Sequence, residues 1–201
     1  MAEARPEGIR AVYEAQAEGF DRTRSRRLVE LRWLERFRAL PPENAALLDL
    51  GCGAGEPIAD YLIGRGHRVT GVDFAAAMLV IARGRFPEAE WVQADMRGLD
   101  LGRRFGGIVA WDSFFHLTRE DQAEMFPVFA RHLVPGGALL FTSGAGDGEA
   151  VGAVGGAAVY HASLSPAAYA GLLEANGFAV RSFQAEDANC AGHSVWLARR
   201  V

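Results

Sequence analysis

Residues 47–55 of this 201-residue chain, Leu-Leu-Asp-Leu-Gly-Cys-Gly-Ala-Gly, constrain its fold more than any other segment. An apolar run leads into three alternate glycines, and a second apolar run ends at Asp73, eighteen residues after the last of these glycines. In parallel α/β sheets, glycines after the first strand let the backbone turn and approach a ligand, and an acid that ends the next strand reaches ribose hydroxyls. The pattern therefore predicts a nucleoside site at the carboxyl edge of a parallel sheet.

The glycine spacing indicates which kind of nucleoside this is. A dinucleotide fingerprint has glycine at its first, third and sixth positions, but here Gly55 is the fifth residue and Glu56 the sixth. An acid, Asp49, also stands two residues before the first glycine, Gly51. This arrangement resembles the motif of class I S-adenosylmethionine (SAM)-dependent methyltransferases, whose site cradles no pyrophosphate.

Strands and helices alternate along the chain, which favours an α/β fold with helices on both faces of a sheet. Apolar residues recur every three positions in a helical run over about residues 9–40, and two prolines then end it. We expect strands at residues 46–50, 68–72, 90–94, 107–110, 138–142, 178–184 and 193–198, and helices at 56–65, 74–85 and 119–133. A further helix begins with Ser165 as its N-cap and Pro166 at its first position, and ends at Asn176-Gly177. Residues 144–162 are rich in glycine and predicted to form a loose loop.

This order is similar to the class I methyltransferase fold. The resemblance implies a doubly wound, mostly parallel seven-stranded sheet with an antiparallel C-terminal strand pair. It also implies two parts, a helical lid over residues 1–45 and a SAM-binding domain over residues 46–201. Besides the glycine motif, three segments carry the resemblance: residues 71–74 (Gly-Val-Asp-Phe), 93–96 (Gln-Ala-Asp-Met) and 133–137 (Leu-Val-Pro-Gly-Gly).

The resemblance implies a set of SAM-binding residues. In the family, the acid of the second segment binds the ribose, the acid of the third meets the adenine amino group, and the residue after it packs on the ring. The implied set is Tyr13, Asp49, Gly51, Cys52, Gly53, Gly55, Asp73, Phe74, Met78, Asp95, Met96 and Trp111. A second interpretation remains, in which the glycines only make a tight turn and Asp73 or Asp95 caps the following helix.

The methyl acceptor should meet SAM at residues 111–117, Trp-Asp-Ser-Phe-Phe-His-Leu, which follow the fourth strand. Family members that methylate amides or base amino groups resemble one another in an Asn/Asp-Pro-Pro-aromatic motif here, and both prolines are missing from this chain. His116 is the candidate general base, since imidazole titrates near neutral pH. The alternative is a histidine that bonds to the backbone at a helix start. The expected acceptor-binding residues are Asp112, Phe114, Phe115, Tyr160 and His161, with ordinary packing as the alternative for the last two.

Aromatic and basic residues mark the N-terminal helix. Tyr13 and Phe20 stand seven residues apart and so share one face. In the family, such aromatics close over the methionine part of SAM, although core packing explains them nearly as well. Seven arginines between positions 22 and 38 form either a solvated face with acidic partners or a surface that attracts an anionic acceptor.

The composition narrows the remaining function classes. The formal net charge of −4 disfavours a nucleic-acid-binding protein. Two cysteines without metal or disulfide spacing, and no long apolar run, predict a cytoplasmic protein without a metal, a signal peptide or a membrane span. We predict methyl transfer from SAM to an oxygen or nitrogen of a small molecule, with S-adenosylhomocysteine (SAH) as the product. The alternatives are a non-catalytic SAM- or SAH-binding protein and a protein or RNA methyltransferase.

Overall fold

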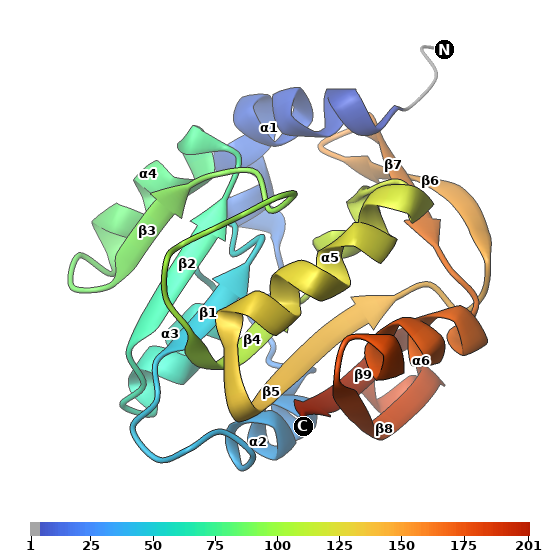
Figure 1. The fold of residues 1–201 in the computed structure, drawn as a ribbon. Helices are drawn as coiled ribbons and strands as arrows, with labels where there is room; N and C mark the ends of the chain where they lie inside the picture. Colours follow the sequence, from blue (N-terminus) through green and yellow to red (C-terminus); the bar gives the residue numbers. More distant parts are fainter. Residues whose placement is uncertain (1–4) are drawn as a thin grey trace.

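A computed structural model describes residues 5–201, which form a twisted sheet covered by helices on both faces (Figure 1). The strands are β1 (Leu47–Leu50), β2 (Val69–Asp73), β3 (Glu90–Gln93), β4 (Phe105–Ala110), β5 (Leu133–Ser143), β6 (Gly148–Val154), β7 (Ala157–Ser163), β8 (Phe178–Asp187) and β9 (His193–Arg200). The α-helices are α1 (Ile9–Thr23), α2 (Leu31–Arg38), α3 (Ile58–Gly64), α4 (Ala76–Arg85), α5 (Arg119–His132) and α6 (Pro166–Ala175). Single 3₁₀ turns span Pro6–Gly8, Phe114–His116 and Ala188–Cys190.

Within residues 5–201, seven strands join in the order β3-β2-β1-β4-β5-β9-β8. Strands β1 to β5 are parallel, whereas β9 pairs antiparallel with both β5 and β8. This confirms the predicted α/β class, the mostly parallel sheet and the antiparallel C-terminal pair. The chain reverses its winding between the adjacent strands β1 and β4, and open α/β sheets bind ligands at such a switch point.

Alternate side chains of the central strands serve the two faces of the sheet. Leu48 and Leu50 of β1 point toward the aromatic residues of α5 and α6, whereas Leu47 packs with α2 and α3 on the other face. Both faces of β1 are therefore shielded from water, which explains why its sequence is a nearly continuous apolar run.

The helix caps follow the sequence. Thr118 accepts a hydrogen bond from the backbone N–H of Asp121 at 3.1 Å, and Ser165 accepts one from Ala168 at 3.2 Å. Pro166 occupies the first turn of α6, as predicted.

The helical run predicted over residues 9–40 is interrupted. Residues 24–30 separate α1 from α2, because the two helices cover different parts of the molecule. Helix α2 buries Trp33, Leu34 and Phe37 completely against the sheet, whereas α1 crosses the carboxyl ends of the strands (Figure 1). One straight helix could not reach both places, and a three-residue repeat of apolar side chains does not reveal the break.

The loose loop predicted over residues 144–162 is also wrong. Strands β6 and β7 form a two-stranded antiparallel hairpin, joined by Gly155 and Gly156 at φ 56° and 82°. Two positive-φ glycines are typical of a tight hairpin turn, so the Gly-Gly pair was the signal for this element. Val159, Tyr160 and Ala162 of β7 pack with Ile9 of α1, so the hairpin supports the N-terminal helix.

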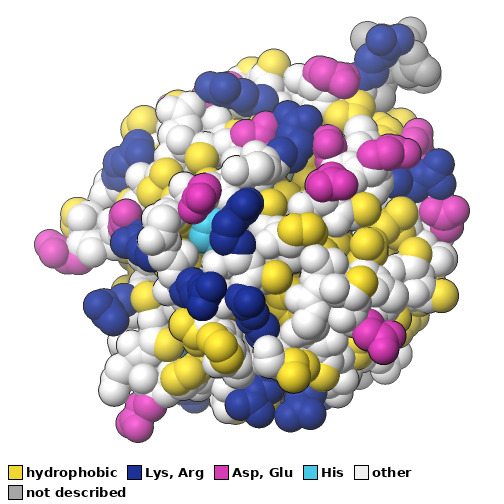
Figure 2. Space-filling model, in the orientation of Figure 1, with side chains coloured by type: hydrophobic (Ala, Val, Ile, Leu, Met, Phe, Trp, Pro, Cys, Tyr) yellow, Lys and Arg dark blue, Asp and Glu magenta, His cyan; other side chains and the backbone are white. Residues whose placement is uncertain are grey.

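Figure 2 shows one face of the molecule, on which acidic side chains gather near the N-terminal end of α5 and the hairpin. Basic side chains gather over the other half of the same face. Among residues 5–201, no helix has the length and apolar content needed to cross a bilayer.

Candidate active site

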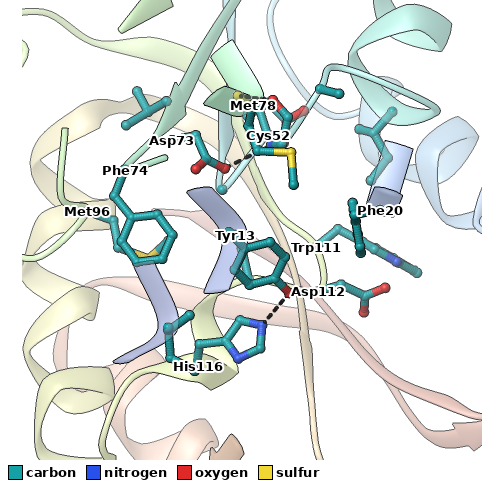
Figure 3. Close-up of a pocket in the computed structure, with 18 of the residues that line it drawn as sticks. Tyr13, Phe20, Cys52, Asp73, Phe74, Met78, Met96, Trp111, Asp112 and His116 are labelled. Carbon is teal, nitrogen blue, oxygen red and sulfur yellow. Dashed lines mark hydrogen bonds between the residues drawn. The ribbon is translucent and has the colours of Figure 1, made fainter. Parts of the chain in front are cut away.

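A cleft lies at the carboxyl ends of β1, β2 and β4 and beneath α1 (Figure 3). It contains about 1190 Å³ of space between atoms, part of which is open to solvent. The predicted site residues that line it are Tyr13, Asp49, Gly51, Cys52, Gly53, Asp73, Phe74, Met78, Asp95, Met96, Trp111, Asp112 and His116. Residues from distant parts of the sequence therefore meet at the predicted edge of the sheet.

Three positions after β1 are occupied by glycine for different structural reasons. Gly51, at φ 73°, lies so close to Ser113 that a β-carbon would collide with that side chain. Gly53, at φ 53°, has no atom within 4 Å of the place where a β-carbon would stand, which leaves its backbone open to the cleft. Gly55 does not line the cleft. A β-carbon there would press against Trp91, so this glycine serves packing.

Two carboxylates of adjacent strands face the cleft. Asp73, at the end of β2, accepts hydrogen bonds from the backbone N–H of Gly53 at 2.9 Å and of Ala75 at 2.8 Å. Burial raises the pKa of Asp73 despite these bonds. The Asp49 side chain is buried, and its carboxylate accepts no hydrogen bond from any residue in the range 5–201. Burial, together with the charge of Asp73, raises the pKa of Asp49 to about 7. An unpartnered buried carboxylate of this kind suits a ligand that carries positive charge.

The third acid, Asp95, follows β3 and lies at the rim. Its carboxylate pairs with Arg97 at 2.6 Å and also accepts the Arg97 backbone N–H at 2.9 Å. The side chains of Met96, Phe74 and Met78 line the cleft beside it and give this end an apolar wall. Cys52 is a buried thiol whose pKa is raised well above its ordinary value by burial, so it is no thiolate at neutral pH.

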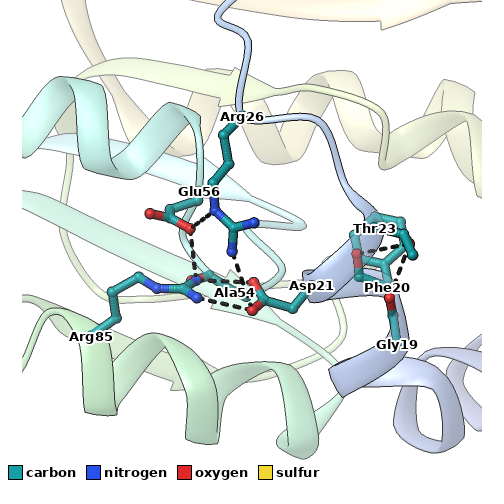
Figure 4. Close-up of polar contacts among 8 residues, drawn as sticks. All are labelled: Gly19, Phe20, Asp21, Thr23, Arg26, Ala54, Glu56 and Arg85. Atoms are coloured by element: carbon teal, nitrogen blue, oxygen red, sulfur yellow. Dashed lines mark hydrogen bonds and ion pairs between the residues drawn. The ribbon is translucent and has the colours of Figure 1, made fainter.

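Helix α1 is fastened over the cleft by polar contacts. The Glu14 carboxylate accepts hydrogen bonds from the backbone N–H groups of Ala76 at 2.7 Å and Ala77 at 2.9 Å, and so caps α4. At the other end of α1, Asp21 accepts two bonds from Arg85, at 3.0 and 2.9 Å (Figure 4). Arg26 and Glu56 complete this ion network, which surrounds the predicted glycine loop.

Tyr13 and His116 meet in the cleft (Figure 3). The Tyr13 hydroxyl lies 3.0 Å from His116 Nε2, and His116 Nδ1 lies 2.9 Å from the carbonyl oxygen of Tyr160. Since a carbonyl only accepts, Nδ1 carries the proton and Nε2 accepts the tyrosine proton. Burial lowers the pKa of His116 to about 4 and raises that of Tyr13 to about 12. Both groups are neutral at pH 7, and a lone pair of the Tyr13 oxygen remains available.

A charged cluster lies beside this pair, and the sequence interpretation missed one of its members, His193. Asp112 follows β4, and its backbone has a positive φ of 48°. Its carboxylate contacts His193 Nε2 of β9 at 2.8 Å and the Arg24 guanidinium at 3.8 Å. The Asp112 carboxylate raises the pKa of His193. His193 stands alone at the start of the last predicted strand, and no local motif distinguishes it. Ser113 was missed as well, although its hydroxyl donates to the carbonyl of Leu50 at 2.7 Å and joins β4 to β1.

Four of the predicted acceptor-binding residues lie outside the cleft. Phe114 is fully buried among Phe126, Phe129 and Phe141, so it belongs to the core. Tyr160 is buried with α1, and only its backbone reaches His116. Phe115 and His161 contact each other with ring centres 4.8 Å apart and line a separate shallow pocket beside the hairpin. These positions follow from the hairpin, which takes the space that the expected loop left open.

Comparison with known sequences finds relatives of the part of the chain that contributes most of the strand ends at the cleft. Residues 47–137 match a family described as "Methyltransferase domain". A dTDP-3-amino-3,4,6-trideoxy-alpha-D-glucopyranose N,N-dimethyltransferase of Streptomyces venezuelae is 36% identical over 105 residues, covering 51% of this chain and 44% of that protein. A trans-aconitate 2-methyltransferase of Azoarcus sp. is 41% identical over 103 residues, covering 50% and 40%. The matched part of the chain thus spans about half the length of these relatives or less.

Solved structures share the fold across nearly the whole chain. CalS10, a SAM-bound amino pentose methyltransferase from Micromonospora echinaspora, has a TM-score of 0.71 at 22% identity and covers 94% of this chain and 97% of its own. The CcbJ methyltransferase from Streptomyces caelestis has a TM-score of 0.77 at 18% identity, covering 94% and 98%. With the glycine motif, the strand order and the matched residues in agreement, residues 47–137 form a methyltransferase domain of the SAM-dependent type.

Proposed function

We propose that this protein transfers a methyl group from SAM to an oxygen or nitrogen of a small molecule, with an amine nitrogen as the favoured acceptor atom. The observation that carries this proposal is the neutral Tyr13–His116 pair within the cleft. Support for a small acceptor comes from the relatives, which by name act on amino sugars and on trans-aconitate.

The end of the cleft formed by the glycine loop, Asp49, Asp73 and Met96, called the cofactor end below, has side chains that fit SAM. We expect the backbone at Gly53 to approach the ligand, Asp73 to hold the ribose and Met96 to pack on the adenine, while Asp49 supplies negative charge. Bound SAM would provide a methyl group on a sulfonium, which an in-line nucleophile can displace. The apolar walls formed by Phe74 and Met78, with α1 above, exclude water from that displacement.

The acceptor end of the cleft, where Tyr13, His116 and Asp112 lie, is better suited to positioning the methyl acceptor than to removing a proton from it. With a pKa near 4, His116 is a weak base, so the general-base role predicted from the sequence fits poorly. Its Nε2 instead holds the Tyr13 proton, which leaves the Tyr13 oxygen to accept a hydrogen bond from an acceptor N–H. An amine that enters the cleft in its neutral form, having left its ammonium proton in the solvent, attacks through its own lone pair, and the methylated ammonium releases a proton to solvent afterwards. An amine therefore suits this site better than a hydroxyl.

The test is single-turnover methyl transfer from labelled SAM across matched amine, phenol and carboxylate metabolites. We expect amines to react, and Tyr13→Phe and His116→Ala each to lower the rate by up to about 100-fold through misplacement of the acceptor. SAH affinity should stay unchanged in both variants. The double variant should be no worse than either single one, since the residues act as a unit.

Two outcomes would overturn this assignment. A loss of about 10⁴-fold in His116→Ala, with a rate profile that follows a group titrating near 6.5, would restore His116 as general base. Tight SAM binding without transfer to any acceptor class would favour the non-catalytic SAM-binding alternative.

The structure also bears on the remaining expectations. We propose that the lid consists of α1 and the turn after it, narrower than residues 1–45, because α2 is buried in the core and residues 1–4 lie outside the described part. We further propose a cytoplasmic enzyme without nucleic-acid partners, supported by two free cysteines and by charges of both signs on the face in Figure 2.

A further inference from the structure

Arg24 is a cationic side chain at the acceptor end of the cleft. It follows the last residue of α1, where its backbone N–H still donates to the carbonyl of Phe20 at 2.7 Å. Its backbone then turns to an extended conformation, with ψ at 130°, and the side chain lines the cleft with 27% of its surface exposed. The arginine is thus held at a fixed point of the lid, on the same helix that carries Tyr13.

The guanidinium of Arg24 has unused hydrogen-bonding capacity. It carries five N–H donors, yet it donates no hydrogen bond to any side chain or carbonyl within residues 5–201. Its contacts are the Asp112 carboxylate at 3.8 Å and the face of the Phe20 ring, 5.7 Å from the ring centre. By contrast, Arg26 and Arg85 in the neighbouring network are engaged by carboxylates at 2.6 and 2.9 Å.

The carboxylate that contacts Arg24 is shared with the imidazole of His193. His193 contacts Asp112 at 2.8 Å, about 1 Å closer than Arg24 does. Glu30, the other acid of this cluster, is 2% exposed, and burial raises its pKa, which weakens it as a counter-charge. The Asp112 carboxylate is therefore not a dedicated partner of the Arg24 guanidinium.

We propose that Arg24 binds a carboxylate or phosphate group of the methyl acceptor, so that the acceptor is an anionic small molecule. The planar guanidinium matches such oxyanions with two parallel hydrogen bonds. The loose contact with Asp112 is easily exchanged for a bound oxyanion. Tyr13 lies on α1 and Arg24 directly follows this helix, so the lid holds the reacting atom and the anionic group of the same molecule. This proposal rests on the methyltransferase function proposed above.

The test uses the SAH-loaded protein and isothermal titration with matched pairs of probes. One set pairs amino acids with their amides, and the other pairs amino sugar phosphates with the unphosphorylated amino sugars. We expect at least one anionic probe to bind tenfold or more tightly than its neutral partner, and the set to which it belongs distinguishes a carboxylate from a phosphate. Arg24→Gln should abolish that preference, and Arg24→Lys should keep part of it.

The matched control is Arg22→Gln, which removes an arginine of the same helix that is 73% exposed and points away to Glu18. It should leave the preference intact. The proposal is overturned if no anionic probe binds more tightly than its partner, or if the preference survives in Arg24→Gln. Loss of SAH binding by the wild-type protein would instead defeat the proposed methyltransferase function, so the two failures are distinguishable.

Discussion

The two ends of the cleft are built in different ways. The cofactor end uses consecutive residues at the tips of neighbouring parallel strands, so that one loop and two carboxylates make most of it. The acceptor end joins α1, the turn after β4 and the start of β9, through contacts such as Tyr13 with His116 and Asp112 with His193. The first end is fixed by local backbone geometry, whereas the second depends on how distant elements pack.

This difference explains how one fold serves many acceptors. The cofactor end cannot change without disturbing the sheet, since Gly51 and Ser113 interlock at the switch point. The acceptor end is carried by a lid helix and by side chains whose replacement leaves the sheet intact. Selectivity for the acceptor can therefore vary while SAM recognition stays constant.

The largest expected effect is at the cofactor end. Gly53→Val should lower SAH affinity at least 100-fold, because its side chain would enter the cleft at the point where the backbone is open. The matched control is Gly66→Val, at φ 85°, which imposes similar backbone strain away from the cleft. Isothermal titration gives the comparison. Equal SAH affinity in the two variants would place the cofactor elsewhere.

An intermediate effect concerns the charge of Asp49. Its raised pKa of about 7 leaves it largely protonated below that pH, and a cationic ligand stabilises the ionised form. SAM binding should therefore release a proton, and SAM affinity should fall about tenfold per pH unit below pH 7. Calorimetric titrations in buffers of different ionisation enthalpy measure the number of protons that are released when SAM binds. Asp49→Asn should remove the dependence, and an unchanged pH dependence in that variant would contradict the assignment.

The smallest expected effect is at the lid. Glu14→Gln weakens the cap that joins α1 to α4, and loss of such a cap costs about 0.5–2 kcal/mol. Backbone N–H donors lower the pKa of Glu14, so this contribution is present at neutral pH and is lost as the pH falls through that lowered pKa. Chemical denaturation measures it, with Glu18→Gln, 88% exposed on the same helix, as control. Equal stability of both variants would mean that the cap does not fasten the lid.

The sequence signals brought together most of the residues that line the proposed cofactor end because these signals are local, and their role in binding SAM stays a prediction. The residues around Gly51, Asp73 and Asp95 can be recognised without knowing where any other segment lies, since strand ends of a parallel sheet share one edge. The succession of strands and helices along the chain followed from the alternation of apolar runs, whereas the mostly parallel sheet was implied by the family resemblance. Gly55 lines no cleft because its neighbour Trp91, on another strand, takes that space.

The acceptor end was predicted poorly because its contacts join remote segments. Phe114 and Tyr160 have the chemistry of pocket residues, but tertiary packing directs the first ring into the core and the second against α1. The partner of Asp112 is His193, which only the antiparallel pairing of β9 with β5 brings to this edge. Side-chain chemistry suggests which residues could form a site, but the topology of the fold determines which of these residues lie close together.

The central claim is that the carboxyl edge of β1 and β2 binds SAM rather than a dinucleotide. Thermal denaturation of the wild-type protein with SAH, SAM or NAD tests it most directly. SAH or SAM at a hundred times its dissociation constant should add roughly 2.7 kcal/mol to the free energy of unfolding, and NAD should add nothing. Stabilisation by NAD without any response to SAM or SAH would contradict the account.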